Sequence, residues 1–127
     1  MNFRITGDEF NPDIISKELQ IEPNECWKKG DKVKNRSVLR DFSCWNYKIK
    51  YEESLDVNNQ LIPLIDKIKS NKNKLIEMKK HQNLDYKINI VIQIENNEKP
   101  AIYLNSESIE FANSINAEFD IDLYTYS

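Results

Sequence analysis

The stretch YKINIVIQIE, from Tyr86 to Glu95, decides the fold that this sequence predicts. Isoleucine occupies every second position from Ile88 to Ile94, and most of the positions between are polar. This alternation is typical of a strand with one buried face, and β-branched side chains favour a pleated surface. We therefore expect the stretch to form a central strand of a sheet that is covered on one side.

Three further segments alternate apolar and polar residues in the same way, and we expect strands over residues 3–6, 43–51 and 119–126. The first of them ends at the turn pair Gly7-Asp8. The second carries an aromatic row that includes Trp45, Tyr47 and Tyr51. Residues 101–104 fit either a short edge strand or an extended lead-in to the helix that follows.

Apolar residues at three- and four-residue spacing predict helices over residues 12–20, 56–81 and 106–116, the second of them interrupted at residues 70–73. The first helix has the clearest start, because Asn11 is a favourable N-cap and Pro12 suits the first helical position. Pro23 limits its far end, since the residue before a proline avoids the helical conformation. Helices and strands therefore alternate along the chain.

The predicted order is strand, helix, strand, helix, strand, a possible extra edge strand, helix and strand. It predicts a single small α+β domain over residues 1–127, because a chain of 127 residues has room for one hydrophobic core. We expect a mixed or antiparallel sheet of four or five strands with the helices mainly on one face.

Composition indicates a water-soluble protein of the cytoplasm. Hydrophobic residues make up 39% of the chain, and no apolar run approaches the roughly 18 residues that a membrane span needs. The N-terminus lacks the cationic and apolar regions of a secretory signal. Cys26 and Cys44 fit free thiols in a reducing compartment. The prominence of Asn, Ile and Lys, which have AT-rich codons, suggests a bacterial source.

The sequence offers few residues for catalysis or cofactor binding. His81 is the one histidine, which excludes a metal site made of several histidines from one chain. Its neighbours Lys79 and Lys80 favour a solvated helix end over a general base. Gly7 and Gly30 are the only glycines, which excludes a glycine-rich phosphate-binding loop. We therefore expect a protein that is not an enzyme and that holds no metal or other cofactor.

The last predicted strand supplies the first set of candidate binding residues. One of its rows combines acidic and aromatic side chains: Asp120, Asp122, Tyr124 and Tyr126. Two carboxylates on one face could act as an acid-base pair, but the sequence offers them no other catalytic partner. We favour an exposed sheet face that complements the basic surface of a protein partner.

Residues 26–42 form a locally basic segment in a chain whose formal net charge is -3. They supply the alternative binding residues: Trp27, Lys28, Lys29, Lys32, Lys34 and Arg36, to which Trp45 and Tyr47 could be added. A tryptophan beside lysines resembles the stacking platforms that bind single-stranded nucleic acid. Because the whole-chain charge disfavours that partner, we expect a solvated loop, with the Trp27 indole mostly buried against the first helix and the sheet edge.

Several short motifs together resemble one bacterial family. They are Phe3-x-Ile5-x-Gly7, Phe10-x-Pro12-x-x-Ile15-x-x-x-Leu19-x-Ile21-x-Pro23, Lys29-Gly30-Asp31, Trp45 and Ile121-Asp122-Leu123-Tyr124. In order and spacing they resemble the domain-of-unknown-function 4279 (DUF4279) family over nearly the whole chain. The resemblance implies a small α+β domain without an established activity, and it transfers no catalytic residues. A glycine is usual in that family where this chain has Gln20, which predicts a different helix exit here.

The favoured function is a non-catalytic protein-binding domain, of the immunity type that neutralises a toxin partner. This preference is an analogy with small bacterial domains that act beside toxins. The alternative is a nucleic-acid or nucleotide binder that uses the basic segment from Trp27 to Arg40.

Overall fold

Five strands form one mixed sheet in the order β2-β3-β1-β4-β5 in the computed structural model, which describes residues 1–50 and 56–126. The strands are β1 (Asn2–Gly7), β2 (Glu25–Trp27), β3 (Ser43–Lys48), β4 (Leu84–Glu95) and β5 (Ala117–Tyr126). β1 pairs antiparallel with β3 and β4, β2 pairs antiparallel with β3, and β5 pairs parallel with β4. The predicted mixed sheet is confirmed, and β4 is an interior strand.

One of the five strands, β2, was not predicted, because it lies inside a segment expected to be a loop. Three residues are too few to show a period of two, so no local pattern reveals this strand. Residues 101–104 lie outside the named strands, and among residues 1–50 and 56–126 their ladder contact is an isolated bridge between Ala101 and Asp56. The predicted second strand ends at Lys48, and Tyr51 falls outside the described residues.

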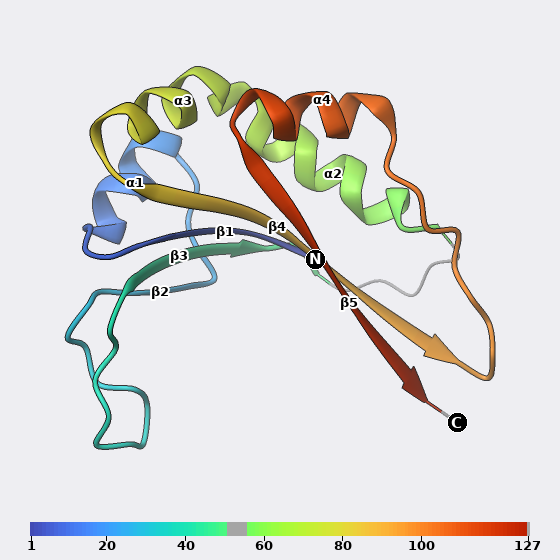
Figure 1. Cartoon of the computed structure of the whole chain (residues 1–127), viewed down its shortest axis with the longest axis horizontal. Helices are drawn as coiled ribbons and strands as arrows, with labels where there is room; N and C mark the ends of the chain where they lie inside the picture. The colour runs from blue at the N-terminus through green and yellow to red at the C-terminus, as the bar shows by residue number, and fades with distance from the viewer. Residues whose placement is uncertain (51–55, 127) are drawn as a thin grey trace.

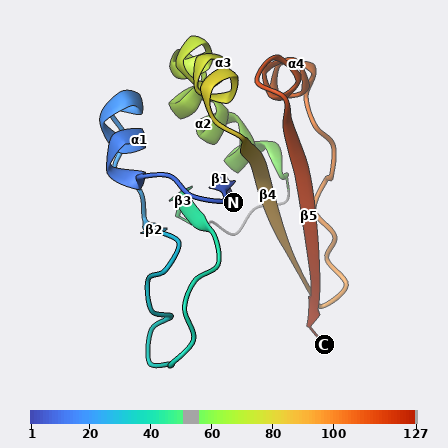
Figure 2. The ribbon, with the colours of Figure 1, turned by 60° about the vertical axis from the view of Figure 1, so that its left-hand side comes forward.

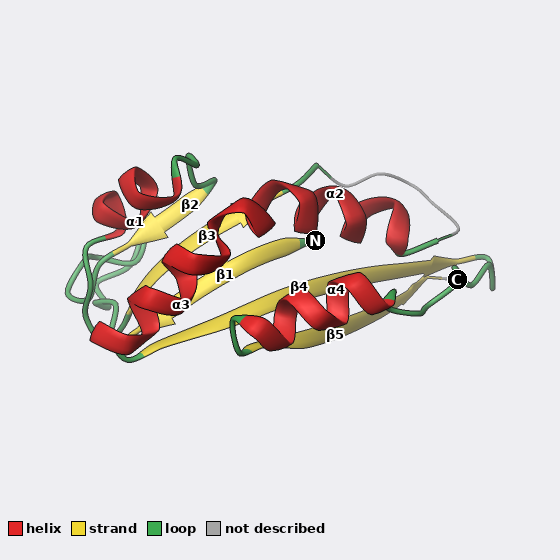
Figure 3. Cartoon of the chain, turned by 90° about the horizontal axis from the view of Figure 1, so that it is seen from above, coloured by secondary structure: helices red, strands yellow, loops and turns green. Residues whose placement is uncertain are grey.

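Four α-helices cover one face of the sheet and leave the other face open (Figure 1 and Figure 3). They are α1 (Pro12–Leu19), α2 (Asn58–Ile68), α3 (Lys72–His81) and α4 (Ser106–Ser114), and the 3-10 turn η1 (Lys69–Asn71) joins α2 to α3. This turn lies where the sequence predicted an interruption of the second helix, at residues 70–73. Asn11 caps α1 as predicted, because its Oδ1 accepts a hydrogen bond of 3.0 Å from the backbone N–H of Asp13.

The core lies between the helices and the apolar row of β4. Ile88, Ile90 and Ile92 are at most 3% exposed, and the register places Phe3 of β1 directly beside Ile88. The isoleucine row therefore faces the helices, as its period of two predicts.

Two polar atoms inside the core tie helices to the sheet. The Trp45 indole Nε1 donates to Ser16 Oγ of α1 at 3.0 Å, and the Tyr86 hydroxyl donates to the Leu75 carbonyl of α3 at 2.7 Å. Burial also raises the pKa of the Tyr86 phenol. A buried ring with a polar atom needs such a partner, so these bonds fix where α1 and α3 rest.

Helical cover ends before the C-terminal half of β5. Ile121 is 43% exposed and Leu123 is 58% exposed, although both belong to the apolar row of the predicted strand. In Figure 1 and Figure 2 the ends of β4 and β5 project away from the helices. Apolar side chains therefore remain on the surface at this edge of the sheet.

Gln20 ends α1 in the left-handed conformation, with φ 55° and ψ 41°, and its N–H donates to the Ser16 carbonyl. This is the helix exit that glycine adopts most easily. The different exit predicted from the missing glycine is therefore wrong. The chain keeps the left-handed exit, and Gln20 bears its steric cost.

We expect Ile90→Asp to lower the free energy of unfolding by about 4 kcal/mol or more, because it buries an unpaired charge in the core. Gln93→Asp is the matched control, since it adds the same group to the opposite face of the same strand. Urea unfolding measures both. An Ile90→Asp variant that unfolds at the same urea concentration as the parent would show that the isoleucine row does not face the core.

We expect Gln20→Gly to raise the free energy of unfolding by about 0.5–1 kcal/mol, because glycine has no Cβ to strain the left-handed exit. Glu18→Gly, inside α1, should instead lower it by about 1 kcal/mol. Thermal unfolding of the two variants distinguishes the effect of the exit from the general effect of glycine. A destabilised Gln20→Gly would contradict the assigned conformation.

Candidate functional site

The uncovered side of the sheet, called the open face below, carries the side chains that alternate with the core rows. Cross-strand register places Arg4 of β1 between Asn46 of β3 and Lys87 of β4, and Asp120 of β5 beside Asn89 of β4. Successive residues of a strand point to opposite faces, so these side chains lie opposite the core. The open face is therefore polar and charged.

A hollow of about 380 Å³ lies on the open face over β1 and β4. Its lining includes two cations, Arg4 and Lys87, and three carboxylates, Asp8, Asp85 and Asp120. Small-molecule sites are usually more enclosed and more apolar than this hollow. Its chemistry suits the side chains of a protein partner.

Arg4 and Lys87 are register partners, so two cations lie side by side on neighbouring strands. The Nε of Arg4 is buried without a hydrogen-bond partner, and neither residue takes part in an ion pair among the described residues. Such a pair can bind a carboxylate or a carbonyl oxygen of a partner. Neither residue is predicted as a binding residue from the sequence, because local alternation does not reveal the pairing of β1 with β4.

Asp120, Asp122 and Tyr124 lie exposed on the open-face row of β5, where the sequence analysis placed them. Asp120 also lines the hollow. The side chain of Tyr126 lies outside the described part of the chain. On β4, Asn89, Val91 and Gln93 lie opposite these three exposed residues of β5. Asp120 and Asp122 therefore have no lysine or arginine directly across the ladder, whereas Glu118, the third carboxylate of this row, lies opposite Lys87.

Trp27 lies on the open face, so its predicted burial against α1 is wrong. It pairs with Cys44, whereas Trp45, the next residue of β3, contacts α1 from the other face. The partly buried indole packs against Arg40, whose guanidinium carbon is 3.8 Å from the ring centroid, and against Phe42 in an edge-on arrangement at 5.6 Å. A nucleic-acid base would have to displace Arg40 to stack on that side of the ring.

The basic residues lie along a loop, residues 28–42, that extends away from the helices (Figure 2). A backbone hydrogen bond of 2.8 Å from Gly30 N–H to the Arg40 carbonyl closes its base, and the left-handed φ of Gly30, 94°, makes the turn there. The exposed cations of this loop are Lys28, Lys29, Lys32, Lys34 and Arg36. They therefore form a solvated row, as expected.

The other aromatic residues considered for nucleic-acid binding lie elsewhere. Trp45 is fully buried and Tyr47 packs against the core, both on the helix-covered face. Because Trp27 is on the open face, the sheet separates it from both of them. The fold does not bring these three rings into one site.

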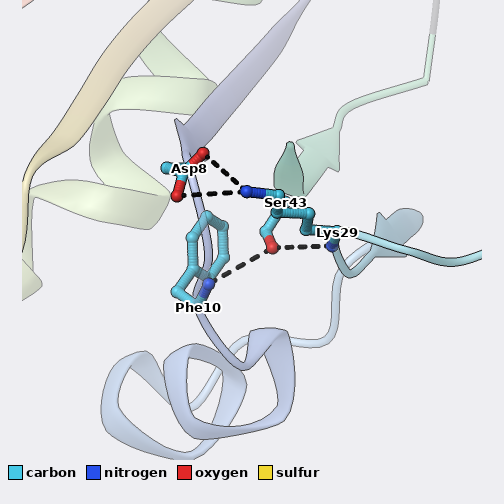
Figure 4. A network of polar contacts seen from close by, with 4 residues as sticks. All are labelled: Asp8, Phe10, Lys29 and Ser43. Atoms are coloured by element: carbon cyan, nitrogen blue, oxygen red, sulfur yellow. Dashed lines mark hydrogen bonds and ion pairs between the residues drawn. The ribbon is translucent and has the colours of Figure 1, made fainter. Parts of the chain in front are cut away.

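A buried serine ties the base of the basic loop to the connection between β1 and α1 (Figure 4). The Oγ of Ser43 accepts hydrogen bonds from the backbone N–H groups of Phe10, at 3.2 Å, and Lys29, at 3.0 Å. The Lys29 ammonium also pairs with the Asp8 carboxylate at 3.2 Å. These contacts hold Asp8 at the rim of the hollow. They join residues far apart in sequence, so no local motif signals them.

Cys26 and Cys44 are free thiols, as expected. They belong to paired strands, but Cys44 lies on the open-face side of β3 and Cys26 pairs with Trp45 on the helix side. Burial raises the pKa of Cys44 to about 11, so this thiol is a poor nucleophile at neutral pH.

His81 lies exposed at the end of α3, as predicted, with its Nε2 3.0 Å from the Glu77 carboxylate. It is on the helix side and takes no part in the open face. Across residues 1–50 and 56–126, no three His, Cys, Asp or Glu side chains are grouped to hold a metal ion. Within the same residues, no helix has the length and apolar character to cross a membrane.

A second hollow, of about 340 Å³, lies between α1 and α3. Its apolar lining includes Phe10, Ile15, Met78 and Ile14, the last of which is 54% exposed. None of the residues predicted as a binding site lies there. The open face is therefore the surface on which the predicted acidic row and a hollow coincide.

We expect Trp27→Ala to lower the free energy of unfolding by about 2–3 kcal/mol, because it removes the ring that packs against Arg40 and Phe42. Trp27→Phe keeps an aromatic ring and should cost about 1 kcal/mol. Urea unfolding followed by the fluorescence of the buried Trp45 measures both. An alanine variant as stable as the parent would show that the indole contributes no packing energy.

The comparison with protein families agrees with the resemblance drawn from the motifs. Residues 1–126 match the family described as Domain of unknown function (DUF4279). No curated protein and no solved structure matches the chain. Because the match spans all but one of the 127 residues, the chain belongs to the DUF4279 family.

Proposed function

We propose that this domain is a non-catalytic protein-binding module of the immunity type, which neutralises a toxin partner by covering a basic surface on it. The open face is the observation that carries the proposal. Charged side chains of β1, β4 and β5, among them Arg4, Lys87 and Asp120, lie on this face. The helices leave this side of the sheet free (Figure 1).

The charges of the open face suit a basic partner with a few acidic or carbonyl groups. Asp120 and Asp122 form an acidic margin on β5, while Arg4 and Lys87 provide cations within the hollow. Tyr124, 49% exposed, adds an aromatic side chain of the type that often anchors interfaces. A charge pattern of this kind favours encounter with a basic nuclease-like surface and orients the partner.

The partner would be another bacterial protein, and the meeting place would be the cytoplasm. The free thiols of Cys26 and Cys44 support a reducing compartment.

Nucleic-acid or nucleotide binding by the basic loop is the alternative. Its exposed lysines support that function, whereas the net charge of -3 and the cation on the Trp27 ring count against it. Titration with a short single-stranded oligonucleotide at low salt tests it, because phosphate contacts weaken steeply as salt rises. Absence of binding at low salt would remove this alternative.

We expect Asp120→Lys/Asp122→Lys to weaken the complex with the partner at least about tenfold, equivalent to ~1.4 kcal/mol, because two attractive contacts become repulsive. The test is co-expression with the product of the adjacent gene, followed by calorimetry on the purified complex and by rescue of growth from toxicity. Glu18→Lys/Glu22→Lys is the matched control. It makes the same charge change at exposed positions near α1 and β2, across the sheet from β5.

Two results would count against the proposed function. One is the recovery of no stoichiometric complex and no growth rescue with the parent chain. The other is a complex that the β5 variant and the control variant weaken equally, since the open face would then not be the interface.

A further inference from the structure

The outer edge of β5 is the longest unpaired edge in the described part of the chain. β5 has ten residues and pairs only with β4 there, whereas the other edge strand, β2, has three residues. An edge strand leaves half of its backbone N–H and carbonyl groups without a ladder partner. β5 therefore presents a long row of hydrogen-bonding groups to solvent.

Acidic side chains protect the edge of β5 against strands of like charge, but most of the other features that commonly protect an edge are missing from residues 117–126. Residues 117–126 contain no proline, lysine or arginine, and every residue of the strand pairs in unbroken register with β4, so no bulge interrupts it. α4 has nine residues and extends about 13 Å, while ten strand residues extend about 33 Å. The helix therefore cannot cover the whole strand, which leaves Ile121 and Leu123 exposed.

The charges of β5 indicate which strand would fit its edge. Its open-face row carries Glu118, Asp120 and Asp122, and its other row carries the exposed Ile121 and Leu123. Residues opposite each other in a ladder share a face, so an added strand should alternate basic and apolar residues.

A second copy of this chain fits the edge poorly. Antiparallel pairing of two β5 strands about residue 120, 121 or 122 places an acidic side chain of one copy opposite an acidic side chain of the other. Like charges directly opposite destabilise a ladder. Charge complementarity therefore favours a basic strand from a different protein.

We propose that the partner docks by strand addition: an extended segment with alternating Lys or Arg and apolar residues pairs with the free edge of β5 and makes a sixth strand. The basic side chains lie against the acidic row, and the apolar ones extend the patch of Ile121 and Leu123. This inference deepens the proposed function and rests on it for the identity of the partner.

The probe is a capped peptide of about seven residues that alternates lysine with isoleucine and valine, added to the isotope-labelled full chain. We expect the NMR amide signals of residues 117–126 to shift on titration. A peptide with glutamate in place of lysine should bind the parent chain about tenfold more weakly or worse. The lysine peptide should lose about the same affinity for the Asp120→Lys/Asp122→Lys variant of the chain. Glu18→Lys/Glu22→Lys should bind like the parent chain.

Two N-methylated peptides separate strand addition from side-chain attraction. One carries N-methyl groups on the lysine amides, and the other carries them on the isoleucine and valine amides. In an extended strand these two sets of N–H groups point to opposite sides, so only one set can reach β5. We expect one methylated peptide to lose binding and the other to keep it. Equal binding by both would overturn the inference.

Two further results would overturn it. The first is no shift in residues 117–126 at millimolar peptide. The second is a dimer in light scattering that Asp120→Lys/Asp122→Lys disrupts, which would assign the edge to a second copy.

Hydrogen exchange on the complex with the adjacent gene product separates this inference from the proposed function. If the complex forms but the β5 amides exchange as fast as in the free chain, the result supports the protein-binding function and contradicts strand addition. A peptide that binds β5, with no complex and no growth rescue, would support strand addition and remove the immunity function.

Discussion

The packing of all four described helices against one face of the sheet is the constraint on which the rest of this structure depends. β1 lies in the middle of the sheet, and its Phe3 and Ile5 are completely buried beside Ile88 and Tyr86 of β4. Because side chains alternate along a strand, this burial also determines every residue on the other face. A register slip of one residue would bring Arg4 into the core, so the packing specifies the register strongly.

The open face is the direct consequence of that register. Arg4, Lys87 and Asp120 come from three strands and share a surface because each alternates with residues that point to the helix-covered face. The helices lie on the opposite side of the sheet, so their packing does not select the charged side chains of Lys87 and Asp120. Their charges are therefore available for recognition, and an interface built on strands holds its side chains more rigidly than one built on loops.

The free edge of β5 follows from the parallel connection that precedes it. A parallel strand needs a crossover, and α4 supplies it by passing over the helix-covered face. A helix rises less than half as far per residue as a strand, so a short helix cannot cover a long strand along its whole length. Exposed Ile121 and Leu123 are the result. The fold itself thus combines an unpaired backbone edge with an apolar patch.

The sequence by itself determined the features that depend on neighbouring residues. The isoleucine row of β4, the capped start of α1 at Asn11 and the exposed acidic row of β5 all follow from local periodicity or local hydrogen bonding. These patterns report the direction of each side chain relative to its own strand or helix.

Only the tertiary structure decided which of these elements are neighbours. The three-residue β2, the position of Trp27 on the open face and the pairing of Arg4 with Lys87 all depend on strand order. The exposure of Leu123 depends on how far α4 reaches. Strand order and helix reach arise from contacts between residues distant in sequence, and a local period carries no information about them.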